Sequence, residues 1–293
     1  MKTKFIINPI AGTGKQIGIE NSILNIVDKT IFDYDIEYTK SPNHATEITK
    51  NAVKNNYELI ISVGGDGTAS ECAKELIGSK TGLAVIPSGS GNGFAYHFGV
   101  KRKINEALKQ LHSNKFILID SCKINNQKFI NVSGLGFDAH IANLFASNKK
   151  RGFLSYIKLT LQELFYSAQE YEIEYENKSR KIKAFAIVFA NASQYGNDAR
   201  ISPRAKADDG LIDFVIINKF PNWKIPFFLI DVLRGKTHLN KNVEIIRSKK
   251  ILIKSDKPMV HLDGEVKNLK NPINVEIEEK NLKLFIPNEE KEK

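Results

Sequence analysis

A short apolar run that ends in a glycine-rich turn constrains the fold of this chain more than any other stretch. Residues 59–62 (Leu-Ile-Ile-Ser) lead directly into Val63-Gly64-Gly65-Asp66-Gly67-Thr68, and residues 70–77 then show helical spacing. A short β-branched run closed by turn residues is typical of a buried parallel strand. The stretch therefore predicts a strand, a tight turn and a helix.

The turn has the composition of an anion-binding loop. We expect its glycines to allow positive φ angles and a close approach of ligand to the main chain, at a helix start whose N–H groups lack partners. Asp66 would place a carboxylate beside a bound phosphate, which requires a bridging cation. The alternative is a structural turn in which Asp66 caps the helix through the N–H of Thr68 or Ala69.

The same order of strand, loop and helix occurs four times in the first hundred residues or so. Residues 4–8, 34–39 and 82–87 are further predicted strands, and the loops 9–15 and 88–95 also carry glycines. Such a pattern predicts a parallel, doubly wound α/β sheet with its ligands at the carboxyl ends of the strands. We expect the three glycine-bearing loops to converge there.

Two common nucleotide motifs are not matched. A Walker A loop would need glycine at Pro9 and Ser or Thr at Gln16, so the P-loop pattern fails. The spacing GxGxxG is interrupted in all three loops, by Ile17, Ser70 and Phe94. A hydride-transferring dehydrogenase is therefore disfavoured.

From about residue 115 the pattern changes to short strands separated by turns, with a few helices. This half predicts a mainly antiparallel β domain. Residues 282–286 are expected to return as a strand to the first domain, and Lys280-Asn281 is expected to be a turn. The predicted domains are residues 1–122 with 281–293, and residues 123–280.

Two polar stretches stand out in the second half. Asp208-Asp209-Gly210 predicts either a Mg²⁺ site or a hairpin turn, with equal weight. Asp263-Gly264-Glu265 is better explained as a turn, and His261 has no partner pattern and is interpreted as incidental.

Size, charge and cysteine content limit the class of protein. A chain of 293 residues favours two domains. Its 43 Lys and Arg against 33 Asp and Glu favour anionic partners: a nucleotide, a nucleic acid or an acidic membrane surface. Cys72 and Cys122 form no CxxC pair and are expected to be reduced and buried. With no signal peptide and no membrane-spanning run, the protein is expected to be cytoplasmic.

Five stretches, taken together and in this order, resemble the diacylglycerol kinase catalytic-domain family, and more narrowly its soluble bacterial lipid kinases, which are related to sphingosine and ceramide kinases. The resemblance implies an N-terminal α/β domain similar to that of NAD kinases and a C-terminal β-sandwich domain, with nucleotide and lipid in the cleft between them. The stretches are residues 8–14, 64–68, 87–92, 208–210 and 263–265.

The resemblance also implies roles for matching positions. Asp66 falls on the essential acidic position and Glu265 on the proton acceptor, with ATP as donor and Mg²⁺ as cofactor. The backbone carbonyls of Lys206 and Leu211, with the Asp209 side chain, fall on a second, structural Mg²⁺ site. The residues that match the ATP site are Asn8, Pro9, Ala11, Gly12, Gly14, Thr39, Gly64, Gly65, Gly67, Thr68, Ser70, Glu71, Gly89, Ser90 and Asn92.

The sequence thus predicts an ATP-dependent kinase of diacylglycerol or a related lipid alcohol. Residues 89–93 (Gly-Ser-Gly-Asn-Gly) lack the family's frequent final acid and are closer to sphingosine-kinase-like members. A sphingoid-base kinase, a soluble-substrate kinase similar to NAD kinase, and a nucleotide- or membrane-binding module without catalysis remain as alternatives. Transient contact with an anionic membrane is expected, and a homodimer is left open. Nucleic-acid binding is not expected, because aromatic residues are not interleaved with the basic ones.

Overall fold

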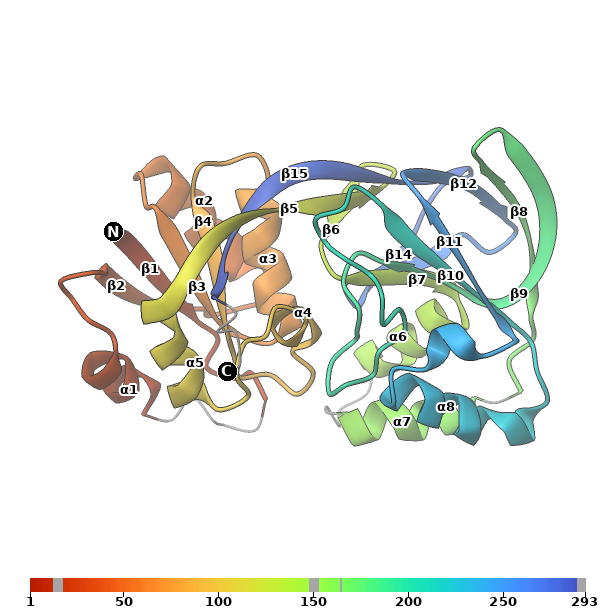
Figure 1. Cartoon of the computed structure of the whole chain (residues 1–293), viewed down its shortest axis with the longest axis horizontal. Coiled ribbons are helices and arrows are strands. Elements are labelled where there is room, and N and C mark those ends of the chain that lie inside the picture. Colours follow the sequence, from red (N-terminus) through yellow and green to blue (C-terminus); the bar gives the residue numbers. More distant parts are fainter. Residues whose placement is uncertain (13–17, 148–152, 164, 289–293) are drawn as a thin grey trace. The chain divides into compact units, whose positions relative to one another are not determined.

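The computed structural model describes residues 1–12, 18–147, 153–163 and 165–288. The chain divides into two compact units, unit 1 (Met1–Ile119 with Lys280–Lys293) and unit 2 (Asp120–Glu279). Two strands, β5 (Asn114–Ile124) and β15 (Ile273–Pro287), belong in part to each unit (Figure 1).

Unit 1 is built on a parallel sheet. Its strands are β1 (Lys2–Ile7), β2 (Asp33–Tyr38), β3 (Leu59–Gly64), β4 (Gly82–Pro87) and the last part of β15, in the order β15-β4-β3-β1-β2. All the residues of β3 and β4 are buried, which is why these strands are continuous apolar runs. The predicted parallel α/β sheet is confirmed.

Helices cover both faces of this sheet. On one face, α1 (Ile19–Ile26) and α5 (Ile104–Gln110) pack Ile23 and Leu108 into a core with Phe5 and Ile61. On the other face lie α2 (His44–Lys54) and α3 (Asp66–Leu76), which pack against each other. Short helices α4 (Gly93–His97) and η1 (Leu111–Ser113) complete the unit.

Unit 2 is mainly antiparallel β structure, as the sequence predicts. Its strand β9 (Lys178–Ala190) pairs antiparallel with three neighbours, β7 (Val132–Gly136), β8 (Gln169–Tyr175) and β10 (Ile212–Asn218). The sheet continues beyond β7 with β13 (Met259–Leu262) and β14 (Glu265–Asn268), beyond β8 with β12 (Lys250–Ser255), and beyond β10 with β11 (Val243–Ser248). The short strand β6 (Gln127–Phe129) pairs with β5.

Among the described residues of unit 2, one apolar core lies around Phe189 and Phe214 and another around Val188 and Val215. Because side chains alternate along β9 and β10, successive residues enter different cores. The helices of the unit are α6 (Phe137–Ser147), α7 (Phe153–Gln162) and α8 (Ile225–Leu233), with the single turns η2 (Asn222–Lys224) and η3 (Thr237–Leu239).

One predicted turn is wrong. Lys280-Asn281 lies inside β15, which continues through Lys280 at a φ of 49°. Its distal residue Leu284 pairs in parallel with Leu83 of β4 in unit 1. Among the described residues, none of the helices has the length and apolar character needed to cross a membrane.

Candidate functional site

Three loops of unit 1 meet at the carboxyl edge of its sheet. Asn8, directly after β1, donates from Nδ2 to Thr68 Oγ1 of α3 at 3.0 Å, and its backbone N–H donates to Val63 O at 2.9 Å. The N–H of Ser88, directly after β4, donates to Gly64 O at 2.9 Å. The predicted convergence of the loops after β1, β3 and β4 is therefore confirmed.

The loops approach so closely that glycine is required at two contacts. A Cβ on Gly89 would lie 2.5 Å from the Cα of Gly65. A Cβ on Gly12 would lie 2.2 Å from the carbonyl oxygen of Ser88. Real Cβ atoms do not come this close to backbone, so a side chain at either position would push two loops apart.

The expected reason for the glycines of the β3 turn is wrong in part. Among Gly64, Gly65 and Gly67 none has a positive φ, and Gly65 has φ −94°. Gly64 is needed because a Cβ there would lie 2.6 Å from the Thr68 side chain. Gly64 and Gly65 therefore serve close packing rather than left-handed backbone, whereas a Cβ on Gly67 would meet nothing within 4 Å.

Asp66 is the first residue of α3 and not its N-cap, which is Gly65. Its carboxylate Oδ1 accepts the backbone N–H of Phe94 at 3.0 Å, at the start of α4. Asp66 therefore ties the loop after β3 to the loop after β4. Its negative charge in the first turn of α3 also interacts favourably with the helix dipole.

Two more residues of the predicted ATP site form hydrogen bonds with backbone groups of nearby residues. Asn92 forms a two-point clamp on Gly89, accepting its N–H at Oδ1 (2.9 Å) and donating from Nδ2 to its carbonyl (2.8 Å). Glu71 Oε2 accepts the N–H of Ala45 at 3.2 Å, in the first turn of α2. These contacts make the edge a preorganised cradle of main-chain groups.

The other predicted ATP-site residues of unit 1 lie on or beside these loops. Thr39 follows β2, and its N–H donates to Ile7 O at 2.9 Å. Ser70 is buried in α3, Ser90 is exposed in the loop after β4, and Gly14 lies outside the described residues. Pro9 is exposed and Ala11 partly exposed in the loop after β1.

In unit 2, Glu265 begins β14 and is exposed. The preceding residues form a hairpin turn between β13 and β14, with φ of 49° at Asp263 and 93° at Gly264, so the turn prediction is confirmed. The Asp263 carboxylate accepts the N–H groups of Asn131 at 2.9 Å and Ile130 at 3.1 Å. The turn that presents Glu265 is thus anchored to the segment before β7.

The same turn is anchored by a buried histidine, so the interpretation of His261 as incidental is wrong. Gly264 donates its N–H to His261 Nδ1 at 3.2 Å, and His261 Nε2 lies 2.7 Å from Asp138 Oδ2. Since Nδ1 accepts a hydrogen bond, the ring proton resides on Nε2 and is donated to Asp138. The hydroxyl of Tyr195 donates to the same carboxylate oxygen at 2.9 Å.

Burial is the main cause that raises the pKa of Tyr195 well above 10.0, with the Asp138 charge next. Tyr195 therefore remains a neutral donor to that carboxylate. The sequence signal for this group is the segment 134–139 (Gly-Leu-Gly-Phe-Asp-Ala), whose GxGxxA spacing after a predicted strand indicates a turn that leads into a helix. That is correct for α6, but spacing alone does not reveal its contact with β13.

The predicted second Mg²⁺ site has its carboxylate engaged by protein groups. Asp209 forms an ion pair with Arg247, and its Oδ1 accepts the N–H of Leu211 at 3.2 Å. Within the described residues, no three His, Cys, Asp or Glu side chains group as a metal site. A second Mg²⁺ site formed by the backbone carbonyls of Lys206 and Leu211 with the Asp209 side chain stays a prediction.

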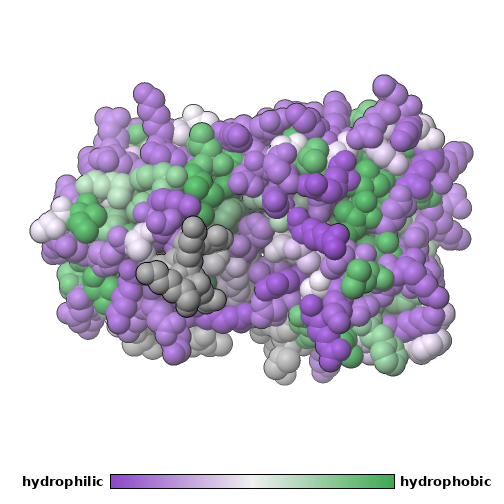
Figure 2. Space-filling model, viewed as in Figure 1, coloured by the Kyte–Doolittle hydropathy of each residue, from purple (hydrophilic) through white to green (hydrophobic). Residues whose placement is uncertain are grey.

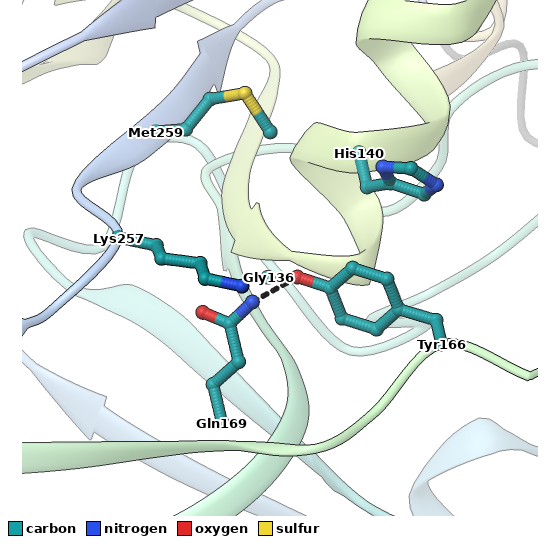
Figure 3. Close-up of a pocket in the computed structure, with 6 residues that line it drawn as sticks. All are labelled: Gly136, His140, Tyr166, Gln169, Lys257 and Met259. Atoms are coloured by element: carbon teal, nitrogen blue, oxygen red, sulfur yellow. Dashed lines mark hydrogen bonds between the residues drawn. The ribbon is translucent and has the colours of Figure 1, made fainter.

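A pocket of about 130 Å³ lies elsewhere in unit 2 (Figure 3). In it the Gln169 side-chain amide donates to the Tyr166 hydroxyl, and the Lys257 amine points toward the same space. None of the predicted site residues lines it. Its lining residues are Gly136, His140, Tyr166, Gln169, Lys257 and Met259.

Comparison with known families assigns both halves of the chain. Residues 2–124 match the diacylglycerol kinase catalytic domain, and residues 131–286 match the YegS C-terminal NAD kinase beta sandwich-like domain. The chain belongs to the diacylglycerol kinase family. The fold expected from the resemblance, an α/β domain followed by a β-sandwich-like domain, is confirmed.

Relatives of this family match over most of the chain. A diacylglycerol kinase of Bacillus subtilis is 29% identical over 278 residues, covering 90% of this chain and 89% of the relative. A "probable lipid kinase YegS-like" of Chromohalobacter salexigens is 26% identical, covering 78% and 76%. The crystal structure of a "putative diacylglycerol kinase" from Bacillus anthracis superimposes with a TM-score of 0.80 at 26% identity, covering 98% and 95%. These names indicate a lipid kinase.

Proposed function

We propose that this protein is an ATP-dependent lipid kinase that transfers the γ-phosphoryl group to a primary hydroxyl of diacylglycerol or a related lipid alcohol. The observation that carries the proposal is the convergence of the loops after β1, β3 and β4 in a chain of the diacylglycerol kinase family. ATP is the proposed phosphoryl donor because the chain is related to kinases.

The triphosphate would lie against the main chain of these loops. Backbone N–H groups in the first turn of α3 would supply donors for phosphate oxygens, and the glycines of the convergent loops would let the triphosphate approach the main chain. Asp66 stands in the first turn of α3 and is partly exposed, so its carboxylate fits a role beside a bridging Mg²⁺. When bound, that ion would neutralise charge on the transferred phosphoryl group.

Glu265 is the proposed general base. It would accept the proton of the lipid hydroxyl while the hydroxyl oxygen forms its bond to the γ-phosphorus and the bond from that phosphorus to the β,γ-bridging oxygen breaks, releasing ADP. The hairpin turn anchored by Asp263 and His261 supports the side chain for this task. The cleft in which the resemblance places nucleotide and lipid together stays a prediction.

The decisive experiment measures transfer from γ-labelled ATP to a panel of lipids and water-soluble acceptors in mixed micelles. We expect label in diacylglycerol or a sphingoid base, and a loss of about a hundredfold or more with Glu265→Gln. Glu174→Gln, an exposed glutamate on β8, is the matched control and should keep full activity.

Two outcomes would contradict the proposed reaction, and a third would contradict only the role of Glu265. Label only in a water-soluble acceptor such as NAD would establish the soluble-substrate alternative. ATP binding without label in any acceptor would leave a binding module. Full activity of Glu265→Gln would remove Glu265 as the base while leaving the reaction itself in place.

A further inference from the structure

Helix α8 is apolar on two faces although it lies at the surface of unit 2. Phe228 and Val232 pack into the core around Val188. On the outer face, Phe227 is 62% exposed and Ile230 is 42% exposed. A helix that is apolar all round is normally enclosed by protein or lipid. Among the residues that the structure describes, none covers the outer face of α8.

The exposed apolar residues form one continuous surface. Trp223 in η2 is 67% exposed, and its ring meets that of Phe227 edge to face with centroids 6.4 Å apart. Spacings of four and three residues place Trp223, Phe227 and Ile230 on one side of the helix, with Leu233 at its margin. We call these four residues the α8 surface. Figure 2 shows apolar surface beside hydrophilic surface in the region where Figure 1 labels α8.

Positive charge flanks the α8 surface along the chain. The one acidic side chain in the segment 219–241, Asp231, already accepts a hydrogen bond from Asn240 at 2.9 Å. The Lys224 amine lies 5.1 Å from the centre of the Trp223 ring. Among the residues that the structure describes, no ion pair is made by the five cations of this segment, Lys219, Lys224, Arg234, Lys236 and Lys241.

An anionic lipid bilayer fits this combination better than a second copy of the chain. A twofold dimer would place the α8 surface against itself and bring Arg234 and Lys236 toward their own copies, which is repulsive. At a bilayer, apolar side chains enter the acyl boundary, tryptophan occupies the headgroup level, and Lys and Arg contact anionic headgroups.

We propose that the α8 surface docks this protein onto anionic membranes, with Trp223, Phe227 and Ile230 inserted among the lipids. The inference rests on the proposed function, because a long-chain lipid alcohol resides in a bilayer. It assigns the membrane contact to one apolar helix face of unit 2 rather than to basic residues alone.

Trp223 is the only tryptophan of the chain, so its fluorescence reports on this surface alone. The full-length protein is mixed, without ATP or diacylglycerol, with vesicles of phosphatidylcholine or of phosphatidylcholine containing 30% phosphatidylglycerol. We expect a blue shift of emission and quenching by brominated acyl chains with the anionic vesicles only. Unchanged emission with both would overturn the proposal.

Two sets of variants separate apolar insertion from charge. Phe227→Glu should lower vesicle partitioning about tenfold or more, whereas the control Leu24→Ala, an exposed leucine on α1, should not. The double variant Arg234→Gln with Lys236→Gln should lower vesicle partitioning about 25-fold at low salt, because each cation near the surface raises partitioning roughly fivefold. The matched pair Lys54→Gln and Lys109→Gln in unit 1 removes equal charge and should have little effect.

Kinase assays distinguish this inference from the proposed function. Phe227→Glu should retain activity on a short-chain diacylglycerol in solution and lose activity on long-chain diacylglycerol in vesicles. Vesicle binding by a protein that labels no lipid would contradict the kinase but not the docking surface. If light scattering shows a dimer that Phe227→Glu converts to a monomer, and emission does not respond to vesicles, the partner is a second copy and the proposal is wrong.

Discussion

The carboxylate of Asp66 combines two roles that substitution can separate. It accepts the Phe94 N–H, and it brings negative charge to the start of α3. Asparagine keeps an oxygen acceptor of the same reach and removes the charge, whereas alanine removes both.

We therefore expect Asp66→Asn to fold with nearly unchanged stability and to lose lipid kinase activity about a hundredfold or more. Asp66→Ala should also lose about 1–3 kcal/mol of unfolding free energy, because the Phe94 amide is left without its acceptor. Urea unfolding and transfer of labelled phosphate measure the two effects. Wild-type activity in Asp66→Asn would show that the charge is not needed.

His261 joins two contacts, a buried one with Asp138 at Nε2 and a partly buried one with Gly264 at Nδ1. His261→Leu removes the donor to Asp138 and the acceptor of Gly264 N–H, and should cost about 2–3 kcal/mol of unfolding free energy. His261→Asn keeps an oxygen near the Nδ1 position and His261→Gln keeps a donor near Nε2, so each should recover part of the loss. His112→Leu, at an exposed site, is the control. Equal stability of His261→Leu and wild type would contradict the network.

Cys72 illustrates how burial controls a titratable group. Desolvation raises the pKa of its thiol from 9.0 to about 12, so the folded protein holds it neutral at pH 8. Its contribution to stability is full below pH 9 and is lost as the pH rises toward 12. We expect a thiol reagent at pH 8 to modify Cys72 only after unfolding. Rapid modification of the native protein would contradict this.

At the scale of elements, the apolar pattern predicts much of the architecture. The runs at β3 and β4 are buried along their whole length, so their hydrophobicity alone identifies them as interior strands. The edge where three loops meet follows from the rule that parallel strands end at one side of a sheet. These features depend on local sequence and on general topology.

Contacts between distant residues could not be predicted in this way. Asp138 and His261 are brought together because α6 packs beside β13, and no spacing between residues 123 positions apart records that. The true reason for Gly65, its contact with Gly89, likewise depends on the distance between two loops. The pairing of Asp209 with Arg247 depends on the register of β10 and β11.

The glycines of the convergent loops should respond differently to alanine. Gly89→Ala places a Cβ 2.5 Å from the Gly65 backbone and should cost about 1–3 kcal/mol, with weaker nucleotide binding. Gly67→Ala meets nothing within 4 Å and stands in a helical first turn, so it should preserve or raise stability by roughly 0.5–1 kcal/mol. Thermal unfolding with and without ATP compares them. Equal stability of the two variants would contradict the close approach of the loops.

At the scale of the whole molecule, unit 1 depends on the far end of the chain. Leu284 of β15 is 2% exposed and pairs with β4. Leu284→Ala should lower the unfolding free energy by about 2–5 kcal/mol, whereas Leu118→Ala, at a site 52% exposed, should change it little. Denaturant unfolding tests this. A small effect of Leu284→Ala would mean that the sheet of unit 1 does not need β15.

The placement of β15 also sets an order of events during synthesis. When the ribosome has made residue 279, every residue of unit 2 exists, but β4 still lacks the neighbour that Leu284 provides. An unpaired strand edge can associate with other chains. The nascent protein therefore exposes the β4 edge of unit 1 until the distal part of β15 emerges, so the unit begun first is the one completed last.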